Sequence, residues 1–461
     1  MIGKENMIPI KLSEIFSIFD KKMTIEDVDV KNISTDSRTI GTDDLFVPIV
    51  GENFDGHKFI EKALTSGASA SLCNIDQVEK YSQFSEKIIP VENTLDALLK
   101  IAGHYRKQFN FPITAITGSN GKTTVKDILV HLLSAKYKTN GTFENFNNEI
   151  GVPKTVFSCD SNTEFLVVEM GMRGKGQIRK LVSEVKPTSA VISMIGEAHF
   201  ELLGSRKNIA EAKAEITEQL PKSGFVVMNG DDDFADLIEE KSSAPVYFFG
   251  KSDRCMLKIL SCSQKEDGID VEAKYKDQKI NYFVPLLGIH NVYNASGALL
   301  SALLSGVELE KAIEQLKTVK ISGSRIEIIK TDKYTILNDC YNSSPSSAKA
   351  GVAILSSQHA NHRTAIIGDM GELGDISESS HYELGQKIGE AKIDLLLVAG
   401  KFANLVIEGA LSAGMDKNSC ISFEKTENFE KVMDKIPLKS TVLVKASHAM
   451  HFENITKCLS K

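Results

Sequence analysis

Thr117-Gly118-Ser119-Asn120-Gly121-Lys122-Thr123-Thr124 joins a short apolar run at residues 111–116 to a segment with helical apolar spacing at residues 125–133. A strand, a glycine loop and a helix in this order are the context that a phosphate-binding loop requires. The glycines let the backbone approach phosphates, and free N–H groups at the helix start point at the anion. Lys122 adds a positive charge, and the Thr123 hydroxyl suits Mg2+. Residues 117–124 therefore predict a site for ATP phosphates and Mg2+.

The loop is a shortened variant of the general phosphate-loop pattern. That pattern has glycine five residues before Gly121, where Ile116 stands in this chain. An ordinary turn at a helix start is the alternative interpretation. The Gly-Lys-Thr-Thr sequence directly after an apolar strand disfavours this alternative.

The composition is that of a globular protein of 461 residues, a length that predicts about two to four domains. A formal charge of −7 argues against a nucleic-acid-binding role, which usually needs a basic face. The seven cysteines are scattered without CxxC spacing, so neither a disulfide framework nor a zinc site is indicated. There is no apolar signal segment near Met1 and no run of 18 apolar residues. We therefore expect a cytoplasmic protein that is neither exported nor inserted in a membrane.

Strand and helix patterns alternate along most of the chain, which predicts an α/β protein of three domains. Residues 105–320 predict a central phosphate-loop domain with a doubly wound, mostly parallel sheet. Its expected strands include residues 164–169, 189–195 and 225–229, with an antiparallel edge at residues 255–285.

The two flanking domains are also predicted to be α/β. Residues 321–461 predict a C-terminal Rossmann-like domain, with strands at residues 334–339, 364–368, 395–400 and 441–445. Residues 1–104 predict a small N-terminal domain, which a helix at residues 94–105 links to the central one.

Three candidate metal ligands are expected at one edge of the central sheet. Glu169 ends one apolar strand, His199 lies four residues past the next, and Thr123 follows the first. Ligands collect at the carboxyl ends of the strands in open parallel sheets. A carboxylate, an imidazole and a hydroxyl there predict a divalent-metal site beside ATP phosphates, although Mg2+ prefers oxygen ligands. Taken singly, a structural glutamate and an ordinary loop histidine are the alternatives.

Lys213 lies in an apolar helical stripe. The helix is expected to begin near Ser205, a good N-cap, and Lys213 shares one face with Ile209, Ile216 and Leu220. A lysine that extends its ammonium to solvent from the core rim is the ordinary interpretation, and the pattern alone favours it. The alternative is a desolvated lysine with a lowered pKa, whose neutral amine reacts with carbon dioxide to form a carbamate.

Further polar clusters lie where elements begin or end. A predicted helix opens with His290, Asn291 and Asn294. Asparagine amides at this position either cap the helix or form hydrogen bonds to the edge of a purine base. Asp339 ends a strand of the last domain, where a carboxylate can accept hydrogen bonds from ribose hydroxyls. Arg325 is a candidate for reaching a phosphate across an interdomain cleft, with a surface or hinge arginine as the alternative.

Two polar loops near the N-terminus flank a predicted strand at residues 45–49. They contain Asp36-Ser37-Arg38 and Asp55-Gly56-His57. This composition suits a polar ligand, although loops are often polar for no catalytic reason.

Together these motifs resemble those of the Mur ligases, the ATP-dependent amide-forming enzymes of peptidoglycan precursor synthesis. Residues 117–124 match the family's phosphate loop with its shortening, and residues 288–294 match its Gly-x-His-Asn-x-x-Asn signature. Asp339-Cys340-Tyr341-Asn342 with Pro345 resembles the Asp-x-Tyr-Asn-x-x-Pro form of the member that adds D-alanyl-D-alanine. The opening domain resembles UDP-sugar-binding domains. The family tends to have Lys-Gly-Ser-Arg where Lys445-Ala446-Ser447-His448 stands, so this segment's role in closure or dipeptide binding stays open.

The resemblance implies roles for individual residues of this sequence. The implied catalytic residues are Lys122, Glu169, His199 and Lys213. The implied metal ligands are Thr123, Glu169, His199 and a carbamate on Lys213. The implied ATP contacts are Thr117, Gly118, Ser119, Asn120, Gly121, Lys122, Thr123, Thr124, His290, Asn291, Asn294, Arg325, Asp339 and Asn342. The implied substrate contacts are Ser37, Arg38, Asp55, Gly56, His57, Asn145, Asn147, Asn148, Arg173, Glu372 and Leu373.

The resemblance also implies a two-step reaction, and we expect the protein to act as a monomer. The terminal carboxylate of a UDP-N-acetylmuramoyl-tripeptide attacks the γ-phosphate of ATP, and the amine of D-alanyl-D-alanine then attacks the acyl phosphate. Lysine and diaminopimelate are both open as the third residue of the tripeptide. Three alternatives stay open. The first two are a sister ligase that adds one amino acid and a folylpolyglutamate synthetase, which lacks such an opening domain. The third is a non-catalytic ATP-binding switch protein.

Overall fold

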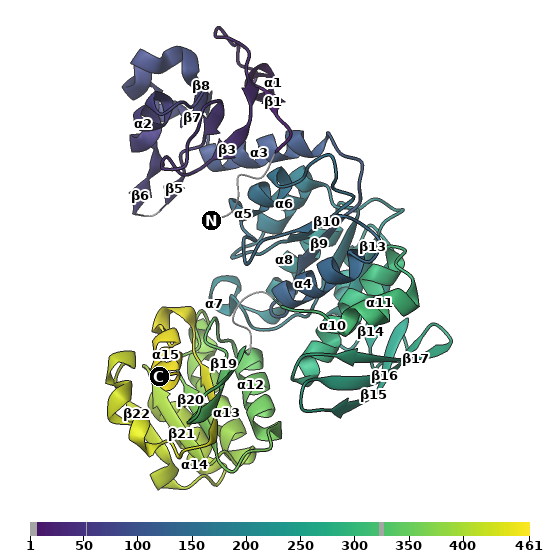
Figure 1. Cartoon of the computed structure of the whole chain (residues 1–461), viewed down its shortest axis with the longest axis vertical. Coiled ribbons are helices and arrows are strands. Elements are labelled where there is room, and N and C mark those ends of the chain that lie inside the picture. Colours follow the sequence, from purple (N-terminus) through teal and green to yellow (C-terminus); the bar gives the residue numbers. More distant parts are fainter. Residues whose placement is uncertain (1–6, 52, 322–326) are drawn as a thin grey trace.

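The computed structural model describes residues 7–51, 53–321 and 327–461. Three regions follow one another along the chain, each built around a sheet with parallel strands (Figure 1). The predicted α/β class with a mostly parallel central sheet is confirmed. The domain bounds at 104 and 320 stay predictions.

The first region contains a four-stranded parallel sheet in the order β3-β4-β7-β8. Helix α3 (Thr94–Arg106) confirms the predicted helix at residues 94–105, and Asn93 caps it by accepting hydrogen bonds from Leu95 N and Asp96 N. Helix α3 packs on α5 (Gly151–Phe157) and α6 (Gln177–Val185) of the central region, so it joins the first region to the central one. The other elements are β1 (Ile10–Lys11), α1 (Leu12–Ile18), β2 (Asp29–Val30), β3 (Asn32–Ser34), β4 (Asp44–Phe46), β5 (Val50–Gly51), β6 (Phe54–Asp55), α2 (Ile60–Thr65), β7 (Ala70–Asn74) and β8 (Ile88–Val91).

The central sheet has nine strands in the order β10-β11-β9-β12-β13-β14-β15-β16-β17. Strand β16 runs antiparallel to both of its neighbours, β15 and β17, as the pattern at residues 255–285 predicted. The strands are β9 (Ile113–Thr117), β10 (Thr139–Gly141), β11 (Phe165–Glu169), β12 (Ser189–Ile192), β13 (Phe225–Asn229), β14 (Val246–Gly250), β15 (Leu257–Gln264), β16 (Ile269–Tyr275) and β17 (Gln278–Val284).

Helices cover both faces of this sheet. Successive strand residues point to opposite sides, so these apolar strands place side chains that need burial on both faces. Ala115 belongs to the apolar core on one face and Ile116 to the core on the other. The helices are α4 (Lys122–Leu133), α5 (Gly151–Phe157), α6 (Gln177–Val185), α7 (Phe200–Leu203), α8 (Arg206–Ala214), α9 (Ala235–Lys241), α10 (Ile289–Leu304) and α11 (Leu309–Leu316).

Strand β12 ends at Ile192, three residues before the predicted end at 195. The cause is the phosphate loop. Ser119 N donates to Met194 O (2.9 Å), and Gly196 N donates to Ser119 Oγ (2.9 Å). Residues 193–196 therefore bond to residues 117–120 instead of continuing the strand.

The third region has a six-stranded sheet in the order β18-β19-β23-β20-β21-β22, parallel except for the β18–β19 pair. The four predicted strands correspond to β19 (Tyr334–Asn338), β20 (Arg363–Ile367), β21 (Leu395–Ala399) and β23 (Ser440–Lys445). The remaining elements are β18 (Glu327–Lys330), α12 (Pro345–Ser357), α13 (Ser377–Glu390), α14 (Ala403–Ser412), β22 (Cys420–Phe423) and α15 (Glu453–Leu459).

No helix in the described ranges is long and apolar enough to cross a membrane.

Candidate active site

The phosphate loop lies between β9 and α4, as predicted, and its backbone requires glycine at two positions. Gly118 and Gly121 have φ values of +153° and +82°. A Cβ on Gly118 would collide with Ser193 Oγ, and one on Gly121 would collide with Asn294 Oδ1. The loop therefore packs against the end of β12 and the start of α10, which brings residues distant in the sequence to the phosphate position.

Two lysines converge on one backbone oxygen of this loop. Lys122 Nζ and Lys213 Nζ each donate to Gly118 O over 2.9 Å. Lys213 is only 1% exposed, although the helical pattern alone favoured a lysine that reaches solvent. Burial lowers the pKa of Lys213 well below its ordinary value, and the Lys122 charge acts in the same direction. The helix start is as predicted, since Ser205 Oγ caps α8 by accepting from Asn208 N.

Glu169 and Thr123 meet below the loop. Strand β11 pairs with β9 in a register that sets Glu169 beside Ile116. Thr123 Oγ1 donates to Glu169 Oε2 (2.7 Å), and Asn147 Nδ2 donates to Glu169 Oε1 (2.7 Å). The carboxylate is fully buried, so two hydrogen bonds compensate part of its lost hydration.

His199 joins this group from the loop after β12. Burial lowers the pKa of its imidazole; Glu372 opposes that shift, and the positive charges of Lys213 and Lys122 add to it. His199 Nδ1 lies 2.6 Å from Glu372 Oε2, a contact between the central and C-terminal regions. The family resemblance had implied a substrate contact for Glu372, and no local pattern pointed to this pairing with His199.

The donor set fits Mg2+ in chemical type. Thr123 and Glu169 present hard oxygen ligands side by side, and carbamylation of Lys213 would add two more oxygens. Over residues 7–51, 53–321 and 327–461, no three His, Cys, Asp or Glu side chains form a metal cluster by themselves. A metal site here therefore depends on the hydroxyl and the lysine as well as on Glu169 and His199.

A cavity of about 620 Å³ opens above the loop, between the central and C-terminal regions. This volume lies within the usual range of small-molecule sites. Of the residues expected to contact ATP, the cavity lining includes Ser119, Asn120, Gly121, Lys122, Thr124, His290, Asn291, Asn294, Asp339 and Asn342. Sequence reasoning missed other lining residues, among them Asn229, Asp231, Tyr293, Tyr341, Ser346 and Lys445.

Three of the expected ATP contacts in the described part of the chain, Thr117, Gly118 and Thr123, do not line this cavity. Thr117 is a fully buried end residue of β9, and Thr123 lies beneath the loop against Glu169. Arg325 lies outside the described residues.

A buried ion pair lies in the wall of the cavity. Lys445 Nζ donates to Asp339 Oδ2 (2.6 Å) and to Asn342 O (3.0 Å). Burial lowers the pKa of His290 to about 4; Asp339 opposes this shift and Lys445 adds to it. Asp339 is thus held by a lysine from the segment whose role the sequence left open.

Contacts across the cavity mouth hold the two regions together. Asn120 Nδ2 donates to Ser346 Oγ (2.8 Å) and Ser344 Oγ (3.1 Å). Asn145 Nδ2 donates to Tyr341 Oη. The C-terminal region therefore already faces the phosphate loop in this structure.

Several residues expected to bind substrate have other positions or partners. Asn148 Oδ1 accepts from Gly151 N (2.9 Å) at the start of α5, so its side chain orders that helix. Arg173 is exposed, and its backbone N donates to Gln177 Oε1 (2.6 Å). Leu373 is only 1% exposed and belongs to an apolar core, and its expected substrate contact stays a prediction.

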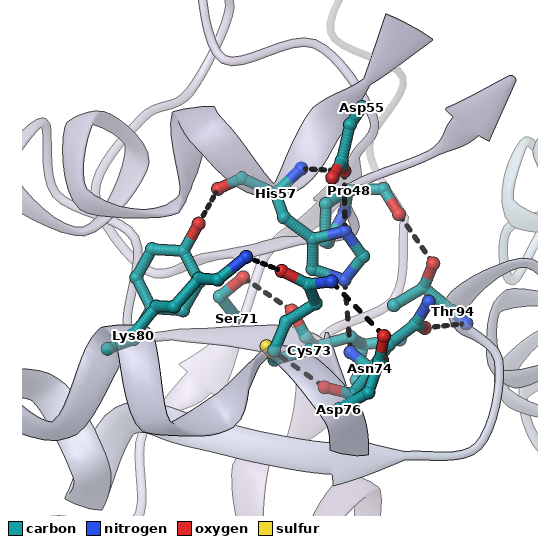
Figure 2. A network of polar contacts seen from close by, with 12 residues as sticks. Pro48, Asp55, His57, Ser71, Cys73, Asn74, Asp76, Lys80 and Thr94 are labelled. Carbon is teal, nitrogen blue, oxygen red and sulfur yellow. Dashed lines mark hydrogen bonds and ion pairs between the residues drawn. The ribbon is translucent and has the colours of Figure 1, made fainter.

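The loop expected to bind the UDP-sugar is held by His57, and Figure 2 shows the network. His57 Nδ1 contacts Asp55 Oδ1 (2.7 Å), and His57 Nε2 accepts from Asn74 N (3.0 Å). Asn74 Oδ1 accepts from Thr94 N (3.0 Å), and Thr94 Oγ1 donates to Pro48 O (2.6 Å). Both ring nitrogens are occupied and the residue is 1% exposed, so His57 orders the loop instead of contacting a ligand.

Other residues of these N-terminal loops differ in accessibility. Gly56 is buried, and a Cβ there would lie 2.7 Å from Ile49 N and O. Ser37 is half-buried. The Arg38 side chain is 82% exposed and pairs with Asp36 (2.7 Å), so its guanidinium faces solvent.

Comparison with known proteins gives matches along nearly the whole chain. Residues 29–106 match the Mur ligase family catalytic domain, residues 116–302 the Mur ligase middle domain, and residues 324–448 the Mur ligase glutamate ligase domain. A Bacillus subtilis protein named UDP-N-acetylmuramoyl-tripeptide–D-alanyl-D-alanine ligase is 37% identical over 93% of both chains. The chain belongs to the Mur ligase family. An Escherichia coli Mur ligase of the same name is 30% identical over 99% of both chains.

Solved Mur ligase structures have the same fold. A crystal structure of MurF from Acinetobacter baumannii has a TM-score of 0.90 at 27% identity, covering 98% of this chain and 99% of that one. MurF ligase from Thermotoga maritima in complex with ADP has a TM-score of 0.81 at 26% identity, covering 94% of this chain and 97% of that one. The predicted membership of the Mur ligases is therefore confirmed.

Proposed function

We propose that this Mur ligase joins D-alanyl-D-alanine to UDP-N-acetylmuramoyl-tripeptide at the expense of ATP, in peptidoglycan precursor synthesis. The observation that carries the proposal is the convergence of Lys122 and Lys213 on Gly118 O, beside the Thr123–Glu169 pair. Lys122 of this group lines a cavity whose other wall comes from the C-terminal region. The names of the full-length relatives support the choice of substrates.

ATP binds with its phosphates on residues 118–124 and its nucleoside in the cavity above them. Backbone N–H groups of the glycine loop and the start of α4 bind the phosphates. Asn291, Asn294 and His290 border the base, and Asp339 accepts from ribose hydroxyls. Arg325 remains a candidate for a phosphate contact.

The first step forms an acyl phosphate. A carboxylate oxygen of the tripeptide attacks the γ-phosphorus, the bond to the bridging β,γ-oxygen breaks, and ADP leaves with that electron pair. Lys122 stabilises the negative charge that spreads over the transferring group; one such preorganised interaction contributes roughly 3–4 kcal/mol. Closure of the two walls excludes water, which would otherwise hydrolyse the acyl phosphate.

The second step forms the amide. The neutral amine of D-alanyl-D-alanine attacks the acyl carbon, the C–O bond to phosphate breaks, and inorganic phosphate leaves. Glu372, on the loop that meets His199, orients the incoming dipeptide. The nitrogen loses its proton to solvent or to the departing phosphate.

Thr123, Glu169, His199 and the carbamate of Lys213 would hold Mg2+. The ion would neutralise phosphate charge when bound. The carbamate forms when the unprotonated amine of Lys213 attacks carbon dioxide and loses a proton, and burial favours that amine because it lowers the pKa of Lys213.

The UDP-sugar binds at the N-terminal loops. Arg38 directs its exposed guanidinium toward the diphosphate, and Ser37, Asp55 and Gly56 border the site. Asn145, Asn147 and Arg173 lie on the muramoyl side. We further propose that the protein acts as a monomer in the cytoplasm, where ATP is available.

A coupled assay of ADP release tests this function. UDP-muramoyl-tripeptides with lysine or diaminopimelate are compared with and without D-alanyl-D-alanine, and with single amino acids in its place. The proposal requires rapid ADP release only with the dipeptide. Equal rates with single amino acids would favour a sister ligase, and ATP binding without turnover would favour a switch protein.

A further inference from the structure

The loop at residues 368–374 lies between β20 and α13 and reaches the central region. Its Glu372 approaches His199, and Glu201 N donates to Glu372 O (3.1 Å). Glu372 has a φ of +60° and His199 a φ of +66°, an uncommon backbone region for both residue types. Such conformations persist only where surrounding contacts determine them, so this loop needs firm support.

His381 supplies part of that support from α13. Its Nε2 accepts a hydrogen bond from Met370 N (2.9 Å), and its Nδ1 lies 2.6 Å from Ser377 O. A backbone N–H only donates and a carbonyl only accepts, so Nε2 carries no proton and Nδ1 carries one. His381 is therefore a neutral imidazole in one defined tautomer. Its Nε2 lies 3.9 Å from Asp369 Oδ1 but carries no proton to donate to that oxygen.

The surroundings of His381 hold the ring in place. The residue is fully buried, and its ring stacks on Phe402 with centroids 4.5 Å apart. Asp369 accepts from Lys401 N (2.7 Å) and Phe402 N (3.1 Å), which fastens the loop to the segment before α14.

The segment that departs from the family pattern supports the same loop through its backbone. Gly368 N donates to Lys445 O (2.9 Å), and Ser447 N donates to Asp369 O (3.0 Å). These bonds do not depend on the side chains at positions 446–448. Backbone groups of residues 445 and 447 and the side chains of Asp369 and His381 thus hold the loop together.

We propose that His381 is a positioning residue for the incoming amine substrate, acting through Met370 N to fix the loop at residues 368–374 and the carboxylate of Glu372. This inference rests on the proposed function for the identity of that substrate. His381 contacts no reactant and acts through the loop alone.

Two near-isosteric replacements separate its two hydrogen bonds. Glutamine places an amide group near the Nε2 position, so His381→Gln retains an acceptor for Met370 N. Asparagine places its amide near Nδ1, so His381→Asn retains the donor to Ser377 O and leaves Met370 N without a partner. His359, an exposed histidine of the same region, provides the matched control His359→Gln.

Steady-state kinetics of the full chain test the proposal. We expect His381→Gln and His359→Gln to change the KM for D-alanyl-D-alanine less than about threefold, and His381→Asn to raise it about tenfold or more. The KM for ATP should stay within about twofold in all three. An unchanged dipeptide KM in His381→Asn, or an equal rise in the KM for ATP, would overturn the proposal.

Hydrogen exchange of peptides covering residues 366–374 provides a readout that needs no turnover. Protection should be lost in His381→Asn and kept in His381→Gln and His359→Gln. Equal protection in all variants would contradict the positioning role. A wild-type protein without D-alanyl-D-alanine-dependent turnover but with this exchange pattern would reject the proposed function and leave the role of His381 in the loop intact.

Discussion

Lys445 donates a hydrogen bond to Asp339 over 2.6 Å, and this ion pair lies in the wall of the nucleotide cleft. The two residues are about 100 positions apart in the sequence. Lys445 is the last residue of β23, and Asp339 directly follows the neighbouring parallel strand β19. The pair orients the carboxylate that we assign to the ribose, so it connects the stability of the C-terminal region with nucleotide binding.

Lys445→Met should lower the free energy of unfolding by about 3–5 kcal/mol, because it leaves a largely buried carboxylate without its partner. It should also weaken ATP binding. Urea unfolding and calorimetric titration with ATP measure the two effects. In the double variant Lys445→Met/Asp339→Leu, much of the stability should return while ATP binding stays weak. A stable Lys445→Met variant with normal ATP affinity would contradict this role.

Lys213→Ala should reduce kcat by about 100-fold or more, because the site loses a buried amine and the carbamate proposed to form on it. Small carboxylic acids should restore part of the activity by supplying oxygen ligands. Lys207→Ala, an exposed lysine on the same helix, is the control. With labelled bicarbonate, wild-type protein should give a carbamate carbonyl signal that Lys213→Ala lacks. Full activity in Lys213→Ala would end the carbamate hypothesis.

Glu169→Gln should raise the Mg2+ concentration needed for half-maximal activity about tenfold or more. The amide retains an acceptor for Thr123 or Asn147 but loses the negative charge that attracts the cation. Calorimetric titration of the ADP complex with Mg2+ tests binding without turnover. The control is Glu164→Gln. Glu164 directly precedes β11, the strand that Glu169 ends, and its replacement should leave Mg2+ binding unchanged. Identical Mg2+ affinities in wild type and Glu169→Gln would remove Glu169 from the metal site.

Stability should fall as the pH drops below about 6.5, because the pKa values of two histidines, half-buried His290 and buried His381, are lowered in the folded protein. Burial lowers the pKa of His290 to about 4 and also lowers the pKa of His381. Between the unfolded value near 6.5 and these native values, the unfolded chain binds more protons, so the free energy of unfolding rises with pH. Urea unfolding at pH 7 and pH 5 measures the loss. His290→Gln should reduce this pH dependence, and an unchanged slope would show that His290 does not cause it.

Local periodicity was sufficient to predict much of the fold and part of the site. The phosphate loop, Glu169 at the end of β11 and Lys213 in an apolar stripe all follow from spacings within one strand or helix. The parallel topology then implied that the strand ends share one edge, which the β9–β11 and β9–β12 registers confirm. Such features depend on a few consecutive residues and on the fixed geometry of strands and helices.

Only the tertiary structure decided the partners of individual side chains. His57 faces Asn74 instead of a ligand, Leu373 lies in a core, and β12 ends early because residues 193–196 bond to the phosphate loop. The pairings His199–Glu372 and Lys445–Asp339 join segments more than 100 residues apart. Strand register and the packing of one region against another create these contacts, and hydrophobic periodicity carries no information about either.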